Sequence, residues 1–228
     1  MKQFKFSALS AFRIAMMLAL GGVASIGYAQ TITTFDVANS TDTFAGPINP
    51  AGQVTGGYRT ADGAGHGFLR QPDGTIISFD VPGAATGFNL GTTPQAIDPR
   101  GQIIGYYTTQ AAGCNGQCLT YHGFLRQRNG TFITFDVPDA GSGDGQGTIP
   151  EAINPSGEIT GFYLDATYNT HSFLREPDGT IVTLDIPGGD TYPGGINSAG
   201  QIAGEFLDVS PNGTAGHLHG FVRTPPAM

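Results

Sequence analysis

Residues 66–81 read HGFLRQPDGTIISFDV, and closely similar stretches begin at His122 and His171. A shorter copy, HGFVR, begins at His219, and the phrase FDV also stands at residues 35–37. The four histidines are 56, 49 and 48 residues apart. Repetition at such a period is typical of propellers and other repeat proteins, in which each unit stacks on its neighbours.

A second sequence motif precedes each copy of the His-Gly-Phe motif and predicts a tight turn. It begins at Ile48, Ile97, Ile153 and Ile196 and reads INPAGQV, IDPRGQI, INPSGEI and INSAGQI. Proline presets φ at such a turn, and glycine supplies positive φ. Each repeat therefore predicts four strands. In the second repeat these are residues 95–97, 102–107, 122–127 and 131–137.

The composition and the repeat together predict an all-β fold, a four-bladed β-propeller made from four repeats of about 48 residues. The 36 glycines and 15 prolines leave no room for long helices. The last repeat lacks its fourth strand, so we expect Thr31–Val37 to supply it and to close the ring by pairing antiparallel with His219–Arg223. An open β-repeat array and a dimer that completes a larger ring are the alternatives.

The turn at Gln71–Thr75 sets the register of the last two strands. A three-residue loop with Gly74 in the left-handed region places Gly67 opposite Phe79. The ring of Phe79 can then cover the bare glycine backbone. The same register pairs a histidine with an aspartate in every repeat: His66–Asp80, His122–Asp136, His171–Asp185 and His219–Asp36. A pair that recurs once per repeat supports the fold, so we interpret these pairs as structural and not catalytic.

The phrases resemble the HAF repeat of bacterial extracellular proteins, which is named for a His-Ala-Phe core. Here the core reads His-Gly-Phe three times and His-Ser-Phe once, and the resemblance covers about residues 31–223. It implies a secreted β-repeat protein. The family supplies no activity, substrate or catalytic residue to carry over.

The N-terminal segment is typical of a signal peptide. Lys2, Lys5 and Arg13 precede an apolar run at residues 14–26, and Gly27-Tyr28-Ala29 suits a signal peptidase. We expect residues 1–29 to be removed and residues 30–228 to form one domain, extracellular or periplasmic. No later run is long and apolar enough to span a membrane.

The charge of the predicted mature chain excludes several function classes. Residues 30–228 hold seven arginines, no lysine and eighteen acidic residues. A Schiff-base lysine and a phosphate-loop lysine are therefore excluded. Such an acidic chain also repels nucleic acid and anionic lipid.

Two loops have residues that could stabilise them locally, one by a disulfide and one by a bound metal ion. Cys114 and Cys118 are the only cysteines, and an oxidising compartment favours a disulfide between them. The loop at residues 139–145 contains Asp139 and Asp144 and could wrap Ca²⁺, although it lacks the alternating acids of a strong motif. We expect no metal site and no other cofactor.

The loops that differ between repeats are the candidate binding surface. In an antiparallel meander they share one end of the sheets, opposite the repeated Pro-Gly turns, and binding commonly uses loops on a rigid scaffold. Our candidate contacts are Asp42, Phe44, Phe88, Asn89, Tyr121, Asp144, Tyr168, Asp190 and Tyr192.

The predicted function is a secreted, non-catalytic binding module whose partner is an extracellular glycan or protein. No nucleophile elbow, zinc motif or phosphate loop is present. A carbohydrate-active enzyme is the alternative, and it requires two carboxylates in one cleft. A structural extracellular matrix protein is the third possibility.

Overall fold

Antiparallel strands make up the regular structure of the chain. The computed structural model describes residues 31–111, 118–187, 189–208 and 216–226, and these residues contain no helix. The strands are β1 (Asp42–Ile48), β2 (Val54–Arg59), β3 (Gly65–Arg70), β4 (Ile76–Phe79), β5 (Thr92–Ile97), β6 (Ile103–Gln110), β7 (Leu119–Arg126), β8 (Phe132–Phe135), β9 (Gln146–Ile153), β10 (Ile159–Leu164), β11 (Thr170–Arg175), β12 (Ile181–Thr183), β13 (Gly189–Ile196), β14 (Ile202–Asp208) and β15 (Leu218–Arg223). The all-β prediction is confirmed.

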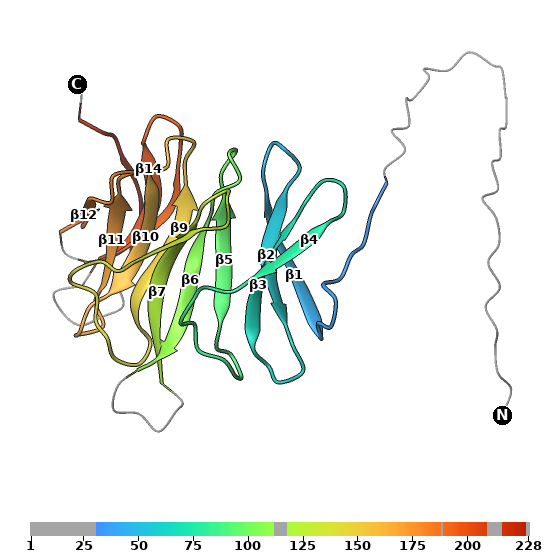
Figure 1. Ribbon diagram of the computed structural model, residues 1–228. Coiled ribbons are helices and arrows are strands. Elements are labelled where there is room, and N and C mark those ends of the chain that lie inside the picture. Colours follow the sequence, from blue (N-terminus) through green and yellow to red (C-terminus); the bar gives the residue numbers. More distant parts are fainter. Residues whose placement is uncertain (1–30, 112–117, 188, 209–215, 227–228) are drawn as a thin grey trace, which may run out of the picture. The chain divides into compact units, whose positions relative to one another are not determined.

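Each repeat forms one antiparallel meander, which we call the first to the fourth sheet (Figure 1). The first sheet is β1–β4, the second β5–β8, the third β9–β12 and the fourth β13–β15. A short parallel pairing of β7 with β9 joins the second sheet to the third. The strands β1, β5, β9 and β13 contact one another in sequence, so the sheets follow each other as the repeats do.

The predicted register is confirmed. Gly67 pairs with Phe79 and Leu69 pairs with Ile77. The N–H of Gln71 donates to the carbonyl of Thr75 at 2.8 Å and closes the three-residue loop. A loop of this length fixes which residues face each other, because a slip by one residue would reverse every side chain.

The first strand of each repeat is longer than predicted. β5 starts at Thr92, three residues before the predicted strand, and continues through Pro94. A bulge follows Pro94, and β9 and β13 have bulges beside Pro150 and Pro193. Proline in a strand is confined to edges and bulges, which is why the sequence pattern reads as loop there.

The core lies between consecutive sheets, and the adjacent residues Ile103 and Ile104 on β6 illustrate this. Both are fully buried. Ile103 packs with Leu69 and Phe79 of the first repeat, whereas Ile104 packs with Phe173 of the third repeat. Successive side chains of a strand point to opposite faces, so this sheet is buried on both sides.

A phenylalanine from each Phe-Asp-Val phrase packs on the following repeat. Phe79 meets Phe124 edge-on with ring centres 6.5 Å apart, and Phe135 meets Phe173 at 6.2 Å. Phe35 meets Phe68 of the first sheet in the same way at 5.8 Å. The phrase therefore serves the contact between repeats as well as its own strand.

The predicted closing strand is wrong. Residues 31–37 form no strand, and the described partner of β15 is β14. Phe35 packs against the first sheet, and the N–H of Val37 donates to Thr43 Oγ1 at 3.1 Å. Val81 donates to Thr92 in the same manner, so residues 35–37 behave as the linker that enters the first sheet.

No described helix has the length and hydropathy needed to cross a membrane. The predicted signal peptide, residues 1–29, lies outside the described residues and stays a prediction.

Candidate binding cleft between the first and second sheets

Three of the four predicted histidine–aspartate pairs are present. Nδ1 of His66 lies 2.9 Å from Asp80, and Nδ1 of His122 lies 2.9 Å from Asp136. Each histidine ring also stacks on an aromatic ring of the neighbouring strand, in the pairs Tyr58–His66, Tyr107–His122, Tyr163–His171 and Phe206–His219. The same packing in every repeat is what a structural role requires.

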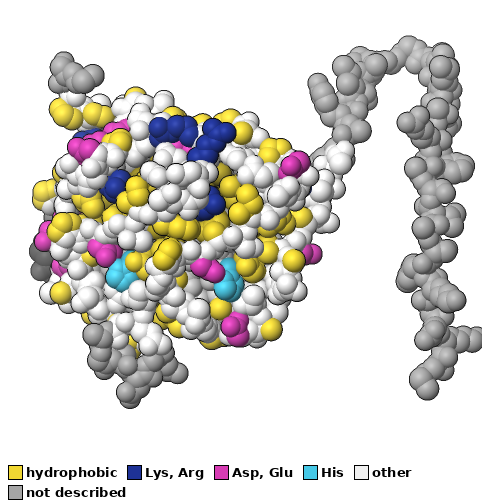
Figure 2. All heavy atoms as spheres, viewed as in Figure 1, with side chains coloured by type: hydrophobic (Ala, Val, Ile, Leu, Met, Phe, Trp, Pro, Cys, Tyr) yellow, Lys and Arg dark blue, Asp and Glu magenta, His cyan; other side chains and the backbone are white. Residues whose placement is uncertain are grey.

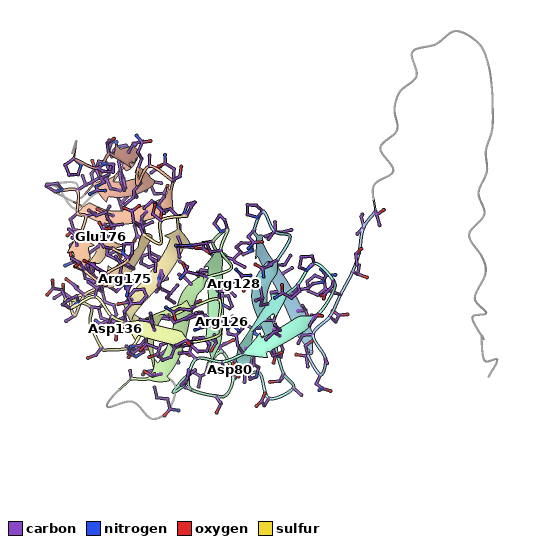
Figure 3. All side chains as sticks on the ribbon, turned by 45° about the horizontal axis from the view of Figure 1, so that its top comes forward. Asp80, Arg126, Arg128, Asp136, Arg175 and Glu176 are labelled. Carbon is purple, nitrogen blue, oxygen red and sulfur yellow. The ribbon has the colours of Figure 1, made fainter. Side chains whose placement is uncertain are left out.

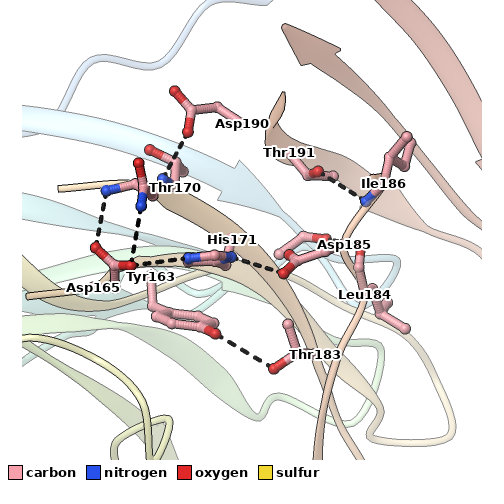
Figure 4. A network of polar contacts seen from close by, with 12 residues as sticks. Tyr163, Asp165, Thr170, His171, Thr183, Leu184, Asp185, Ile186, Asp190 and Thr191 are labelled. Atoms are coloured by element: carbon pink, nitrogen blue, oxygen red, sulfur yellow. Dashed lines mark hydrogen bonds and ion pairs between the residues drawn. The ribbon is translucent and has the colours of Figure 1, made fainter. Parts of the chain in front are cut away.

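The third pair belongs to a larger network (Figure 4). Nδ1 of His171 lies 2.7 Å from Asp185, and its Nε2 lies 3.3 Å from Asp165. Burial alone would lower the pKa of His171, but the hydrogen bonds to Asp185 and Asp165 raise it above its ordinary value. Burial alone would raise the pKa of Asp165, but hydrogen bonds from Thr167, Asn169 and His171 hold it well below its usual range. The network therefore favours a protonated histidine between two carboxylates.

The fourth predicted pair, His219–Asp36, is wrong. Nε2 of His219 lies 3.6 Å from Asp208 of the adjacent strand. Asp36 stands in the segment 35–37, which enters the first sheet and forms no strand.

In the first and second repeats, described connections that vary between repeats meet at one end of the sheets. The N–H of Gly65 donates to the carbonyl of Leu90 at 2.7 Å, and the N–H of Gly145 donates to that of Leu119 at 2.7 Å. These bonds join the crossings from the first sheet to the second, and from the second sheet to the third, to loops between two inner strands. We call this end the loop face and the opposite end, with the Pro-Gly turns, the turn face.

A cleft of about 590 Å³ opens on the loop face between the first and second sheets. Its side chains of interest are Phe44, Tyr58, Arg59, His66, Asn89, Tyr106 and Tyr121. The remaining lining is mostly glycine, proline and threonine, and none of the described residues that line it is an aspartate or glutamate. The cleft is therefore aromatic and polar, with arginine as its one permanent charge.

The side chains of this cleft hold one another in place. Tyr106 and Tyr121 meet edge-on with ring centres 5.3 Å apart. The guanidinium of Arg59 lies 5.6 Å from the Phe44 ring centre and donates to Asn89 Oδ1 at 3.3 Å. Burial, followed by Tyr106 and Asp144, raises the pKa of Tyr121, so its phenol stays a hydrogen-bond donor at neutral pH.

The structure brings together three of the nine predicted contacts, Phe44, Asn89 and Tyr121. Asp42 accepts a hydrogen bond from Thr41 at the start of β1. Phe88 and Tyr168 are 75% and 57% exposed and line none of the clefts described here.

Two residues that were predicted to contact a ligand instead make contacts within the protein. Asp144 Oδ1 accepts the N–H of Leu119 at 2.9 Å and so fixes the start of β7. Tyr192 packs on Phe162 and donates to Thr170 Oγ1 at 3.3 Å.

The last predicted contact, Asp190, lines a second cleft of about 290 Å³ together with His171 and Asp185. This cleft holds two carboxylates. Asp190 accepts the N–H of Thr170 at 2.9 Å, and Asp185 accepts from His171. Both acids are therefore already engaged by the protein.

Sequence reasoning missed Arg59. By register it corresponds to Thr108, Leu164 and Leu207 in the other repeats. The sequence signal that could have identified Arg59 is its positive charge at a position where the other repeats have an uncharged residue.

Cys114 lies outside the described residues, so the disulfide with Cys118 stays a prediction. Within the described part of the chain, no three His, Cys, Asp or Glu side chains form a group that could hold a metal ion. In the loop predicted to bind Ca²⁺, the carboxylate of Asp144 accepts a hydrogen bond from the N–H of Leu119.

Comparison with known proteins assigns no family. No protein-family model matches the chain, and no curated protein matches it. Among solved structures, a catalytically inactive virginiamycin B lyase from Staphylococcus aureus with quinupristin is 17% identical, with a TM-score of 0.47 over 82% of this chain and 58% of that one. A streptogramin B lyase is 16% identical, with a TM-score of 0.46 over 80% of this chain and 55% of that one.

A putative gluconolactonase is 17% identical, with a TM-score of 0.37 over 78% of this chain and 62% of that one. This chain thus spans little more than half the length of the structures it matches. At these values the likenesses assign no activity to it.

Proposed function

We propose that this protein is a secreted binding module and that its ligand enters the cleft between the first and second sheets. The observation that carries the proposal is the composition of that cleft, which gathers four aromatic rings and one arginine without any carboxylate. Ligand sites are commonly concave and aromatic, with a few well-placed polar groups.

The ligand class that fits best is a neutral or carboxylate-bearing glycan. The hydroxyls of Tyr58, Tyr106 and Tyr121 can donate hydrogen bonds to sugar oxygens, and their rings offer apolar surface. Arg59 adds a donor for a carboxylate or a hydroxyl. Hydrolysis is disfavoured at this site because no acid lines it.

The architecture and the location are part of the proposal. The sequential contact of β1, β5, β9 and β13 supports an array of four propeller blades that turn about their first strands. The N-terminal basic and apolar segment supports export.

A glycan array probed with residues 30–228, followed by calorimetry on the hits, tests the function. Arg59→Ala and Tyr121→Phe should weaken binding, whereas Phe88→Ala is the matched control, since Phe88 precedes Asn89 but does not line the cleft. If Phe88→Ala and Arg59→Ala weaken binding equally, the ligand does not occupy this cleft. No binding to any glycan or extracellular protein would overturn the proposal.

A carbohydrate-active enzyme is the second candidate, because Asp185 and Asp190 share the smaller cleft. Release of reducing sugar by the wild-type chain, abolished in Asp190→Asn with the fold retained, would favour it. Asp42→Asn, which changes an acid away from that cleft, is the control.

A further inference from the structure

On the turn face, the second repeat alone gains positive charge at positions where the other repeats have none. Arg100 stands where the other repeats have Ala51, Ser156 and Ala199. Arg128 stands where Pro72 and Pro177 occur, and Asn129 stands where Asp73 and Asp178 occur. Each change adds a positive charge or removes a negative one. Two of the seven arginines after residue 29 are therefore concentrated on turns that other repeats build without them.

The fold brings these three positions into one cleft. A cleft of about 440 Å³ is lined by Arg100, Gln102, Gln127, Arg128 and Asn129. All five side chains can donate hydrogen bonds, and none is acidic. Figure 2 shows arginine side chains gathered at the top of the view, and Figure 3 places Arg128 and Arg126 close to each other on the second sheet.

A smaller cleft of about 140 Å³ continues this surface toward the third repeat. It shares Arg100, Gln102 and Gln127 and adds Arg175 and the turn at Ser156. Arg175 is 6% exposed, and its buried Nε has no acceptor among the described residues. Its guanidinium lies 4.9 Å from the Phe135 ring centre, a contact that stabilises the cation but accepts no N–H hydrogen bond.

Arg100 is held for binding by its own turn. Its Nε donates to Oδ2 of Asp98 at 2.9 Å, and Asp98 is fully buried while the Arg100 side chain is 51% exposed. This bond orients the guanidinium and uses one of its five N–H groups. The described residues supply no acceptor for the other four.

Gln102 is the second unsatisfied group. In the first and fourth repeats the equivalent glutamines accept a hydrogen bond from the amide of Asn49 or Asn197. Asp98 has no such amide, and Oε1 of Gln102 is buried without a partner among the described residues. The amide can rotate, so Gln102 can present either its oxygen or its NH₂ group to a ligand.

We propose that the turn-face cleft lined by Arg100 and Arg128 binds the oxyanion group of an acidic saccharide. That group is a uronate carboxylate or a sugar sulfate. Paired arginines bind carboxylate and sulfate with charge-assisted hydrogen bonds. Three acids next to lining residues accept from protein donors: Asp98 from Arg100, Asp178 from the N–H of Thr180, and Glu158 from the amide of Asn154. Glu176 stands between Arg175 and Pro177 but lines neither cleft. This turn-face site is separate from the loop-face cleft. A failure of either proposal therefore leaves the other untouched.

The test compares the wild-type chain with one that carries the third repeat's residues, Arg100→Ser, Arg128→Pro and Asn129→Asp. These residues already support the same turns at Ser156 and Pro177–Asp178. Arg100→Ser also removes the cation beside buried Asp98, which keeps its hydrogen bonds from the backbone N–H groups of residues 100 and 102, and the melting temperature measures that cost. Calorimetric titration uses trigalacturonate, a sulfated disaccharide, a neutral trisaccharide, and inorganic sulfate and phosphate. We expect the acidic sugars to bind and the triple variant to lose about tenfold or more in affinity.

Arg223→Gln is the matched control, since it removes one positive charge at a residue that lines neither turn-face cleft nor the loop-face cleft, and it should leave this binding unchanged. Equal binding of the acidic sugars by wild type and the triple variant would overturn the site, and so would an equal loss of neutral-trisaccharide binding in the triple variant. Neutral-sugar binding that the triple variant retains belongs to the loop-face cleft. Binding of inorganic sulfate or phosphate alone would overturn the saccharide assignment.

Discussion

The guanidinium of Arg126 lies 4.9 Å from the centre of the Phe79 ring, although the two residues belong to neighbouring repeats. Arg70 covers Phe35 and Arg175 covers Phe135 at the same distance. The His-Gly-Phe-Leu-Arg motif of one repeat thus packs its arginine on the phenylalanine of the Phe-Asp-Val motif that precedes it. This contact explains why both phrases recur together.

Phe79→Ala should destabilise the chain by about 3–5 kcal/mol, since it removes a buried ring and leaves a cavity beneath Arg126. Urea unfolding followed by circular dichroism measures the change. Ile77→Ala is the control on the same strand, because Ile77 is 40% exposed. A loss for Phe79→Ala no larger than the control's would contradict this account of the contact.

Gly67→Ala should be strongly destabilising, while Gly57→Ala on the paired strand should be tolerated. A Cβ at residue 67 would lie 2.4 Å from the Phe79 ring, whereas one at residue 57 would lie 3.6 Å from its nearest neighbour, the His66 carbonyl oxygen. Thermal melts of the two variants measure the difference.

The third repeat supplies the rescue, because Ser172 replaces the glycine where Leu184 replaces the phenylalanine. Phe79→Leu should therefore recover part of the stability lost in Gly67→Ala. Additive losses in the double variant would show that the ring is not the obstacle.

The contribution of His171 to stability should fall as pH rises. Its pKa is raised in the folded chain above the ordinary value of 6.5, so folding favours the protonated ring. The stabilisation is complete below the unfolded pKa and is lost as pH rises through the folded pKa. The difference in unfolding free energy between wild type and His171→Gln should therefore shrink from about pH 5 to about pH 9. A difference that grows over this range would refute the network.

The double variant Asp98→Asn with Arg100→Ala should be more stable than wild type by about 1 kcal/mol. It restores the turn of the first repeat, in which the amide of Asn49 donates to Gln53 and to the carbonyl of Asp98. The new amide would satisfy Oε1 of Gln102, which is buried without a described partner. Chemical denaturation of both chains measures the gain, and a lower midpoint for the variant would argue against it.

Part of the candidate site was predictable and part was not. Phe44, Asn89 and Tyr121 could be chosen because they stand where the repeats differ. Asp144 and Tyr192 fit the same pattern but serve the fold, since a carboxylate that accepts a backbone N–H looks the same in sequence as one that faces a ligand. Arg59 was missed because its place beside Phe44 depends on how β1 and β2 pair.

The repeat, the strand register and three histidine–aspartate pairs follow from the sequence alone. These features depend on local chemistry, since a Pro-Asp-Gly or Arg-Asn-Gly turn sets the loop length and the alternation of side chains carries the register along both strands. Tertiary structure alone decided that Phe35 packs on the first sheet, that the loop-face cleft opens beside Arg59, and that Arg100 and Arg128 line one cleft. Such contacts join residues of different strands and sheets, and many packings of the sheets bury similar apolar area, so only the folded chain selects among them.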